Sequence, residues 1–442
     1  MKSKIEKFDI AVIGGGPAGM MAAGRAAGLG ARVALLEKNS SLGRKLLITG
    51  KGRCNLTQAE FDDKEIIKKF GKNGKFLFSA LDAFGPEEVI RFFEDRTVPV
   101  KIERGGRVFP KSDRAQDVLR ALEKYLEKNN VEIIYDAQVA GFDVAPIASG
   151  GKIASVKLAE KGYVSAEKQA MMPARRIYAD KFIICTGGKS YPATGSTGDG
   201  YQWAKDLGHK IIPPAPALVP IKTKETWVKD VQGLSLKNVT VNLLQNNKKP
   251  AYRTGKQDSR FGEMMFAHFG LTGPIVLDLS KKAGELMAQG EVAISIDLKP
   301  ALDLDQLDAR LQRDFKENSN KDFINYLPEL LPQKIIASIV NLSGIDPRKK
   351  INLVTKEERK RLAGLLKDLR LTADGTTGYN QAIVTSGGVD TREVDSKTMR
   401  SRIVGNLFLA GEILDLDGPT GGYNLQMCWS TGYAAGTYAA KL

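Results

Sequence analysis

The chain has 442 residues, of which 42% are hydrophobic and 26% charged, a composition typical of a globular protein with two or three domains. Its three cysteines, Cys54, Cys185 and Cys428, lie far apart without a CxxC pair, which argues against a disulfide scaffold and a cysteine metal site. No apolar run reaches the length of a membrane span, and the first residues enter a strand without a signal-peptide core, so we expect a cytoplasmic protein without a membrane partner.

The net charge of +15 raises the question of a nucleic-acid partner. Lysines are interleaved with acidic residues along expected helices, as in residues 64–75 and 355–368. A solvated, lysine-rich surface explains that pattern better than a binding face for nucleic acid does. The charge pattern therefore argues against a nucleic-acid partner, and the sequence leaves the oligomeric state open.

The first elements form a βαβ unit. Residues 8–13 are a nearly continuous apolar run, as expected of a strand buried on both faces of a parallel sheet. Three glycines follow at GxGxxG spacing (14–19), and a helix of small residues leads to a second apolar strand, 33–36, which ends at Glu37. This order is the dinucleotide-binding arrangement.

Each glycine of that turn has a distinct expected task. Gly14 makes the tight turn, Gly16 lets a pyrophosphate approach the backbone, and Gly19 lets the helix pack closely on the strand. The free N–H groups at the helix start favour phosphate. Glu37 is placed to accept both hydroxyls of a ribose and would repel a 2′-phosphate, so the unit predicts FAD or NAD.

Residues 41–55 form a glycine-rich loop with several cations, which we expect to lie beside the pyrophosphate. The cations are Arg44, Lys45, Lys51 and Arg53. Cys54 adjoins this positive cluster, which would lower the pKa of a thiol and make it reactive. The alternative, a small half-buried packing residue, is the more common role and the one we favour.

The following residues, 60–130, have mainly helical periodicity, with Asp113 as the expected cap of one helix. Residues 131–139 are predicted to form a strand. At 182–188, FIICTGG repeats the pattern of a strand followed by glycines, and Gly198 and Gly200 turn the chain into a short helix.

The pattern of residue types changes after residue 211. A proline-rich linker, 213–220, precedes alternating strands such as 238–244 and 291–298, which indicate an antiparallel sheet or small barrel. Residues 303–370 then have the pattern of several amphipathic helices. We interpret this region as an inserted domain.

The last segment returns to the first domain. Residues 406–412 form a buried strand ending at Gly411 and Glu412, and Gly422 precedes a final helix of small residues. FAD-type folds complete their cofactor groove in this way. The acid is expected at the ribityl and phosphate side, and the helix start is expected to face the N1–C2=O edge of the flavin, where reduction develops negative charge.

Six motifs resemble the YhiN/BaiN-like family of FAD-dependent oxidoreductases, also known as the aminoacetone oxidase family. They are GGGPAG (14–19), GRKLLITGKGRCN (43–55), TGGKSYPATGSTGDGY (186–201), FGEMMFAHFGLTGP (261–274), VTSGGV (384–389) and AGEILDLDGPTGGYNLQ (410–426). The resemblance covers essentially the whole chain. One departure is the charged stretch 159–176, which we expect to lengthen a hairpin away from the cofactor.

The resemblance implies an α/β fold, in which a Rossmann-like FAD-binding domain of the glutathione-reductase type (1–205 and 381–442) is interrupted by a β-barrel and helical insert (206–380). It implies FAD contacts at Ala18, Glu37, Arg44, Lys45, Gly50, Val139, Glu412, Asn424 and Leu425. To these we add, as predicted cofactor-binding residues, Gly14, Gly16, Gly19, Lys38, Gly43, Gly187, Gly411 and Gly422. No metal site is expected.

We therefore expect a flavoprotein oxidoreductase in which the flavin N5 passes a hydride between NAD(P)H and a small organic acceptor with a conjugated C=C bond, as in an enone. No second GxGxxG is present, so NAD(P)H would dock transiently. One alternative is an oxygen-using, aminoacetone-type amine oxidase, and another is a flavin-containing RNA-associated or regulatory protein. The catalytic acid or base is not identified; the candidates are His268, Tyr191, Tyr423 and Cys54.

Overall fold

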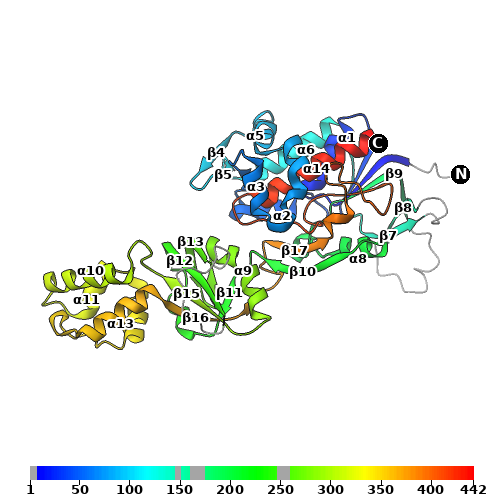
Figure 1. The fold of residues 1–442 in the computed structure, drawn as a ribbon. Coiled ribbons are helices and arrows are strands. Elements are labelled where there is room, and N and C mark those ends of the chain that lie inside the picture. Colours follow the sequence, from blue (N-terminus) through cyan, green and yellow to red (C-terminus); the bar gives the residue numbers. More distant parts are fainter. Residues whose placement is uncertain (1–6, 145–150, 160–174, 246–258) are drawn as a thin grey trace. The chain divides into compact units, whose positions relative to one another are not determined.

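The computed structural model describes residues 7–144, 151–159, 175–245 and 259–442, and the chain divides into two compact units (Figure 1). Unit 1 comprises Met1–Pro216 and Ile383–Leu442, and unit 2 comprises Ala217–Ala382. These limits differ from the predicted insert, 206–380, because strand β10 (Ile211–Ala217) pairs with β17 (Val384–Val389) and so keeps the preceding residues in unit 1.

The main sheet of unit 1 has the strand order β6-β2-β1-β9-β8-β7, and β18 also pairs with β9. Neighbouring strands among β6, β2, β1, β9 and β18 run parallel, whereas β8 is antiparallel to both of its neighbours, β7 and β9. The strands are β1 (Lys7–Ile13), β2 (Val33–Leu36), β6 (Glu132–Ile134), β7 (Val139–Val144), β8 (Ile153–Leu158), β9 (Arg176–Ile184) and β18 (Leu407–Leu409). The apolar runs of β1 and β2 are buried, as a parallel sheet covered on both faces requires.

Two helices far apart in sequence lie side by side in unit 1: α1 (Pro17–Ala27) and the C-terminal α14 (Tyr423–Lys441) (Figure 1). Small residues permit this close approach. A Cβ atom on Gly432 would lie 2.5 Å from the backbone oxygen of Ala18, and one on Gly436 would lie 2.3 Å from that of Ala22. The final helix therefore packs directly on the helix that follows the glycine turn.

The region predicted to be helical, 60–130, is only partly so. Its helices are α3 (Asp63–Lys69), α4 (Phe78–Ala83), α5 (Pro86–Glu94) and α6 (Ala115–Lys128). Between α5 and α6 the chain forms a hairpin, β4 (Val100–Glu103) and β5 (Arg107–Pro110), and β5 also pairs with β3 (Thr57–Gln58). Gly105 and Gly106 make its turn with φ angles of 79° and 74°, values that glycine adopts readily.

Two other local predictions are wrong. Asp113 does not cap α6, because its carboxylate binds Lys101 and Arg53 instead. The strand expected over 131–139 is interrupted at Asp136, which has a φ of 52° and donates its N–H to the carbonyl of Asn39. The helix expected after Gly198 is present as α8 (Asp199–Asp206). Most of the charged stretch 159–176 lies outside the described residues.

Unit 2 contains a closed antiparallel barrel in the order β11-β14-β13-β12-β15-β16. Its helices lie along the chain between β14 and β15 and between β15 and β16, which confirms the predicted barrel-and-helix fold. The strands are β11 (Ile221–Thr223), β12 (Ser235–Gln245), β13 (Ser259–Ala267), β14 (Gly270–Thr272), β15 (Val292–Asp297) and β16 (Leu369–Thr376). The helices are α9 (Pro274–Met287), α10 (Leu304–Glu317), α11 (Phe323–Tyr326), α12 (Ile336–Ser343) and α13 (Lys356–Lys367). Among the described residues, no helix is long and apolar enough to cross a membrane.

Candidate functional site

The glycine turn after β1 has the three-part geometry expected of it. Gly14 has a φ of 104°, and a Cβ there would lie 2.6 Å from the carbonyl oxygen of Cys185. A Cβ on Gly19 would lie 1.8 Å from the oxygen of Gly14, so only glycine lets α1 start this close to the turn. At Gly16, by contrast, a Cβ would meet no atom within 4 Å. Two of the glycines are thus required by backbone packing, and the third faces open space.

That open space lies at the start of α1. The helix has Gly16 at its N-cap with no side-chain cap, and Pro17 at its first turn, where the missing N–H has no cost. The N–H groups of such a first turn, including that of Ala18, have no partner within the helix and attract an anion. The turn can therefore hold a phosphate group.

Glu37 ties the end of β2 to this turn. The residue is 7% exposed. Its Oε2 accepts the N–H of Gly15 at 2.8 Å, and its Oε1 accepts the backbone N–H of Asn39 at 2.8 Å and the side-chain amide of Asn39 at 2.6 Å. The carbonyl of Glu37 accepts the N–H of Ala137, two residues before the buried Val139 at the start of β7. Carboxylate oxygens can accept further hydrogen bonds, so Glu37 retains capacity for a ribose.

Asn39 was not identified from the sequence, although it organises this corner. Besides binding Glu37, its side-chain oxygen accepts a hydrogen bond from Arg44 at 2.8 Å. Lys38, between Glu37 and Asn39 in the chain, binds the carboxylate of Asp199 at 2.9 Å and also donates to the hydroxyl of Thr197. An asparagine two residues after a strand has no pattern of its own, so only its spatial neighbours show this role.

Lys45 and Glu412, predicted as separate cofactor contacts, form an ion pair with N–O distances of 2.8 and 3.1 Å. The Oε1 atom of Glu412 also accepts the backbone N–H of Thr385 at 2.8 Å. Gly187 adjoins this pair, since a Cβ on it would lie 3.9 Å from Glu412. The side chains of Lys45 and Glu412 are 20% and 12% exposed, so this charged pair is largely shielded from solvent.

The glycine-rich loop joins the turn through Gly43, whose N–H donates to the carbonyl of Gly15 at 3.0 Å. Its cation Arg53 does not face an open site, contrary to the expectation that it lies beside a pyrophosphate. The guanidinium binds Glu103 at 2.8 Å and Asp113 at 3.1 Å, and it lies 3.9 Å above the ring of Phe109. Arg53 therefore fastens the loop to the β4–β5 hairpin.

The same loop uses left-handed backbone conformations at Gly50, Lys51 and Cys54, with φ angles of 56°, 59° and 62°. Cys54 is fully buried, and burial raises the pKa of its thiol to about 12. A thiol with so high a pKa carries almost no thiolate at neutral pH. This geometry supports the packing role for Cys54 rather than a reactive one.

The start of α14 is held in place by residues that follow this loop. Gly422 is its N-cap, with a φ of 106°, and a Cβ on it would lie 2.4 Å from the carbonyl group of Thr57. The hydroxyl of Thr57 donates to Gln426 at 2.6 Å, and the indole N–H of Trp429 donates to the carbonyl of Leu56 at 3.0 Å. No side chain caps the helix, so its first N–H groups can interact with an acceptor.

The late strand also reaches the start of α1. A Cβ on Gly411 would lie 2.8 Å from the Cβ of Ala18, and the N–H of Gly411 donates to Thr431 at 3.0 Å. The side-chain oxygen of Asn424 accepts the N–H of Gly418 at 2.9 Å, so Asn424 shapes the loop before α14. Its neighbour Leu425 is half-buried on the first turn of α14.

The acid–base candidates belong to both units. Tyr423 is buried at the first position of α14, and Tyr191 lies in the left-handed region, with a φ of 54°, shortly after Gly187. His268 is exposed in the β13–β14 turn of unit 2. Tyr423 is therefore the candidate that unit 1 places at an end of the site.

The donor set fits a dinucleotide such as FAD. Among the described residues of unit 1, three buried oxygen atoms lack a hydrogen-bond partner: those of the Asn55 and Gln58 amides and of the Thr186 hydroxyl. Thr186 adjoins the glycine turn, and Gln58 adjoins the residues before α14. Buried polar atoms in proteins are nearly always paired, so such orphans indicate a ligand or water. None of the three was assigned a role from the sequence.

Known proteins resemble this chain over nearly its whole length. The family model described as "HI0933-like protein Rossmann domain" matches residues 8–438. The 3-dehydro-bile acid delta(4,6)-reductase of Clostridium scindens is 32% identical over 437 residues, covering 98% of this chain and 99% of that protein. The ribosomal RNA dihydrouridine synthase of Escherichia coli is 30% identical over 433 residues, covering 97% of each.

Among solved structures, the 3-ketosteroid delta1-dehydrogenase of Sterolibacterium denitrificans has a TM-score of 0.55 at 12% identity, covering 98% of this chain and 99% of that one. The 3-ketosteroid-delta4-(5alpha)-dehydrogenase of Rhodococcus jostii has a TM-score of 0.50 at 15% identity, covering 100% and 99%. At these identities the likeness concerns the fold.

Proposed function

Because the chain belongs to the HI0933-like family, the YhiN/BaiN-like FAD-dependent oxidoreductases, we propose that it reduces a C=C bond conjugated to a carbonyl group, with NAD(P)H as the electron donor. One observation carries the proposal. Two relatives with different substrates, each at least 30% identical over nearly the whole chain, have names that describe the same chemistry.

The shared chemistry follows from the names. A double bond at position 4 of a 3-dehydro-bile acid is conjugated to the 3-oxo group, and a second one at position 6 extends the conjugation. Dihydrouridine differs from uridine by saturation of the C5=C6 bond, which is conjugated to the C4 carbonyl. At the double bond of position 4 in the bile acid and at that of uridine, a hydride adds to the carbon β to a carbonyl and a proton adds to the α carbon. At position 6 of the bile acid, the hydride adds to the carbon δ to the carbonyl.

Bound FAD would supply the hydride transfer. The chain's own contribution is to hold and orient the cofactor. The open space at Gly16 and the start of α1 suit the pyrophosphate, Glu37 suits the ribose, and the ion pair of Lys45 and Glu412 suits the polar side of the groove. The uncapped start of α14 would stabilise negative charge near it.

A proton is also needed at the α carbon of the acceptor. Tyr423 and Tyr191 carry hydroxyl groups that can donate one, and His268 offers an imidazole on the barrel. Substitution of each by a residue without an exchangeable proton, such as Tyr423→Phe, would separate them: loss of the proton donor lowers the rate of acceptor reduction and leaves FAD reduction by NAD(P)H unchanged.

A second candidate is that the acceptor is a uridine within RNA rather than a small molecule. The net charge of +15 suits a polyanionic substrate, and dihydrouridine synthases from two organisms are 30% identical over nearly the whole chain. These relatives weigh against the expectation, based on the interleaved charges alone, that nucleic acid is not a partner. The chemistry at the C=C bond is the same in both candidates.

An anaerobic half-reaction experiment tests both candidates. The FAD-loaded protein is reduced with NADH or NADPH, or with dithionite if neither reacts, and is then mixed with a 4-en-3-one steroid or an unmodified ribosomal RNA transcript. Return of the oxidised flavin absorbance, with a product heavier by two hydrogens, supports the proposal and identifies the acceptor class. The saturated steroid and a dihydrouridine transcript are the matched controls.

Two results would contradict it. If no conjugated acceptor reoxidises the flavin but an amine reduces it and oxygen reoxidises it with peroxide release, the protein is an amine oxidase. If only dithionite reduces the flavin, the NAD(P)H part of the proposal is wrong and the acceptor part is judged separately.

A further inference from the structure

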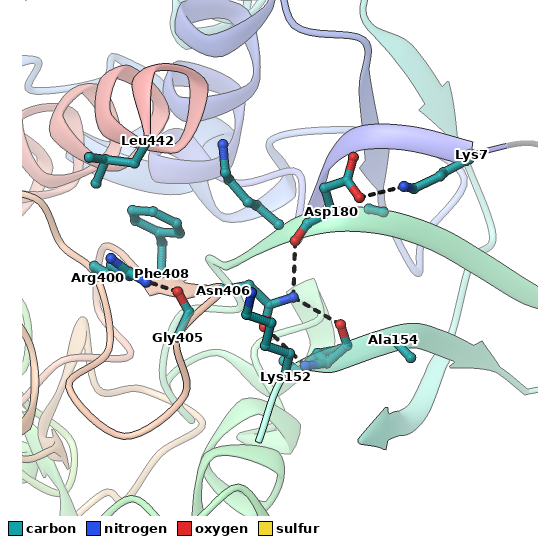
Figure 2. A pocket seen from close by; sticks show the side chains of 12 residues that line it. Lys7, Lys152, Ala154, Asp180, Arg400, Gly405, Asn406, Phe408 and Leu442 are labelled. Carbon is teal, nitrogen blue, oxygen red and sulfur yellow. Dashed lines mark hydrogen bonds and ion pairs between the residues drawn. The ribbon is translucent and has the colours of Figure 1, made fainter. Parts of the chain in front are cut away.

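A separate cavity lies in unit 1 at the edge of the main sheet where its parallel strands begin (Figure 2). Lys7 is the first residue of β1, and Asn406 directly precedes β18, whereas the glycine turn follows the other end of β1. The cavity has a volume of about 460 Å³, within the range of small-molecule sites. Four cations line it: Lys7, Lys152, Lys181 and Arg400.

The floor of the cavity is a fixed frame around Asn406, which is 8% exposed. Its side-chain oxygen accepts the N–H of Ile153 at 3.0 Å, and its amide N–H groups donate to the carbonyls of Ile153 at 2.9 Å and Asp180 at 3.0 Å (Figure 2). These bonds join the start of β8 to β9 and to the start of β18. They fix the backbone from which Lys152 and Lys181, the neighbours of the bonded residues, project.

The four cations of the cavity differ in their partners. Lys7 is neutralised by Asp180 at 2.5 Å. Lys181 donates to the carbonyl of Ala439 at 2.8 Å, and the Nε of Arg400 donates to the carbonyl of Gly405 at 2.7 Å. Neither acceptor is a carboxylate, so both cations keep their formal charge, although the carbonyl of Ala439 belongs to the negative end of the α14 dipole.

Lys152 is exposed and, in the part of the chain that the structure describes, has no carboxylate partner. Lys152, Lys181 and Arg400 therefore line one cavity as three cations that, among the described residues, bind no carboxylate side chain. Such a set suits a polyvalent anion better than a single carboxylate. The terminal N–H groups of Arg400 form a fork that matches two phosphate oxygens, and the lysine ammonium groups act as point charges.

We propose that this cavity binds a phosphate group. This phosphate group belongs either to the phosphodiester backbone of an RNA chain or to a free nucleotide. The RNA source rests on the second candidate function above, whereas the anion site itself does not. The site lies apart from the glycine turn, so an RNA bound there would be anchored away from its reacting base.

The test uses the full-length, FAD-loaded protein, so that nucleotides cannot enter the cofactor site. Lys152→Glu and Arg400→Glu are compared with Lys124→Glu, which makes the same charge change at an exposed position of α6. The probes are a fluorescein-labelled oligouridylate and AMP, with adenosine as the control that lacks phosphate. Binding is measured by fluorescence anisotropy and by calorimetry over a series of salt concentrations.

Lys152→Glu and Arg400→Glu should each weaken binding about tenfold or more, the loss of one charge-assisted hydrogen bond, while Lys124→Glu changes it about twofold at most. For the oligonucleotide, the slope of log K against log salt should fall in magnitude by about 0.7 for each phosphate that is no longer neutralised. A loss confined to the oligonucleotide assigns the site to RNA, and a loss for AMP as well assigns it to a phosphate of either source.

The proposal is overturned if Lys152→Glu and Arg400→Glu behave like Lys124→Glu, if adenosine binds as well as AMP, or if neither phosphorylated probe binds. Arg400→Lys keeps the charge but loses the fork, so its affinity should lie between those of the wild type and Arg400→Glu, a graded result that misfolding does not explain. Turnover plays no part in these measurements, so failure of the proposed reduction chemistry would leave this result interpretable.

Discussion

The assignment of Glu37 to the cofactor can be tested by its removal. Glu37→Ala deletes an acceptor that holds the N–H of Gly15 in the glycine turn and both N–H groups of Asn39, at 2.6–2.8 Å. If the carboxylate also accepts two ribose hydroxyls, the variant loses two charge-assisted bonds to FAD of about 1.5–3 kcal/mol each. The dissociation constant of FAD should then rise by about 10²- to 10⁴-fold.

The structure indicates that part of this loss is indirect. The released N–H of Gly15 and the released side chain of Asn39 would loosen the turn and the adjoining Arg44, because Asn39 binds that guanidinium. The assay is titration of the apoprotein with FAD, followed by quenching of flavin fluorescence. Glu94→Ala, at an exposed end of α5, is the matched control and should bind FAD normally. An unchanged affinity in the Glu37 variant would refute the ribose assignment.

Three further outcomes are expected. Gly432→Ala should lower the free energy of unfolding by about 1–2 kcal/mol, because its Cβ would lie 2.5 Å from a backbone oxygen of α1. Gly364→Ala on α13 has open space around it and should raise the free energy of unfolding by about 0.4–1 kcal/mol. Equal effects of the two substitutions in thermal melts would contradict this packing. Burial lowers the pKa of His209 despite its contact with Glu393, so the unfolded chain binds the proton more tightly than the folded one. The free energy of unfolding should therefore fall as the pH drops below about 6.5. His209→Gln should flatten this pH dependence, as measured by urea unfolding curves. Cys54, with its pKa raised to about 12, should resist thiol reagents until the protein unfolds. The Cys54→Ser variant should keep its FAD, and that FAD should be reduced at the wild-type rate. Rapid labelling of Cys54 in the folded protein would count against the packing role.

The sequence by itself determined the elements whose signals are local. The apolar run of β1, the glycine spacing that follows it and the acid at the end of β2 are close in the chain, and each records a requirement of its own backbone, such as the φ of 104° at Gly14. Alternating apolar residues marked β12 and β15 as strands of the barrel for the same reason. A hydrophobic period or a turn residue is sufficient to predict an element whose neighbours in sequence are also its neighbours in space.

The hairpin of β4 and β5 escaped detection because its strands are short and lie between strong helices, so that the helical period dominated the region. Arg53 was placed beside the cofactor from its neighbours in the glycine-rich loop. Its true partners, Glu103 and Asp113, are 50 and 60 residues away and become available only once that hairpin exists. A cation in a loop has no sequence signal for which anion it will meet.

Only the tertiary structure decided which parts of the predicted site meet one another. Lys45 and Glu412, 367 residues apart, form an ion pair because β18 joins the sheet beside β9 and brings the late strand to the first loop. The hydrogen bonds of Asn406 likewise join three segments that are far apart in the sequence, around residues 153, 180 and 406. Pairings of this kind depend on the order of strands in the sheet, which a one-dimensional pattern of apolar and polar residues does not contain.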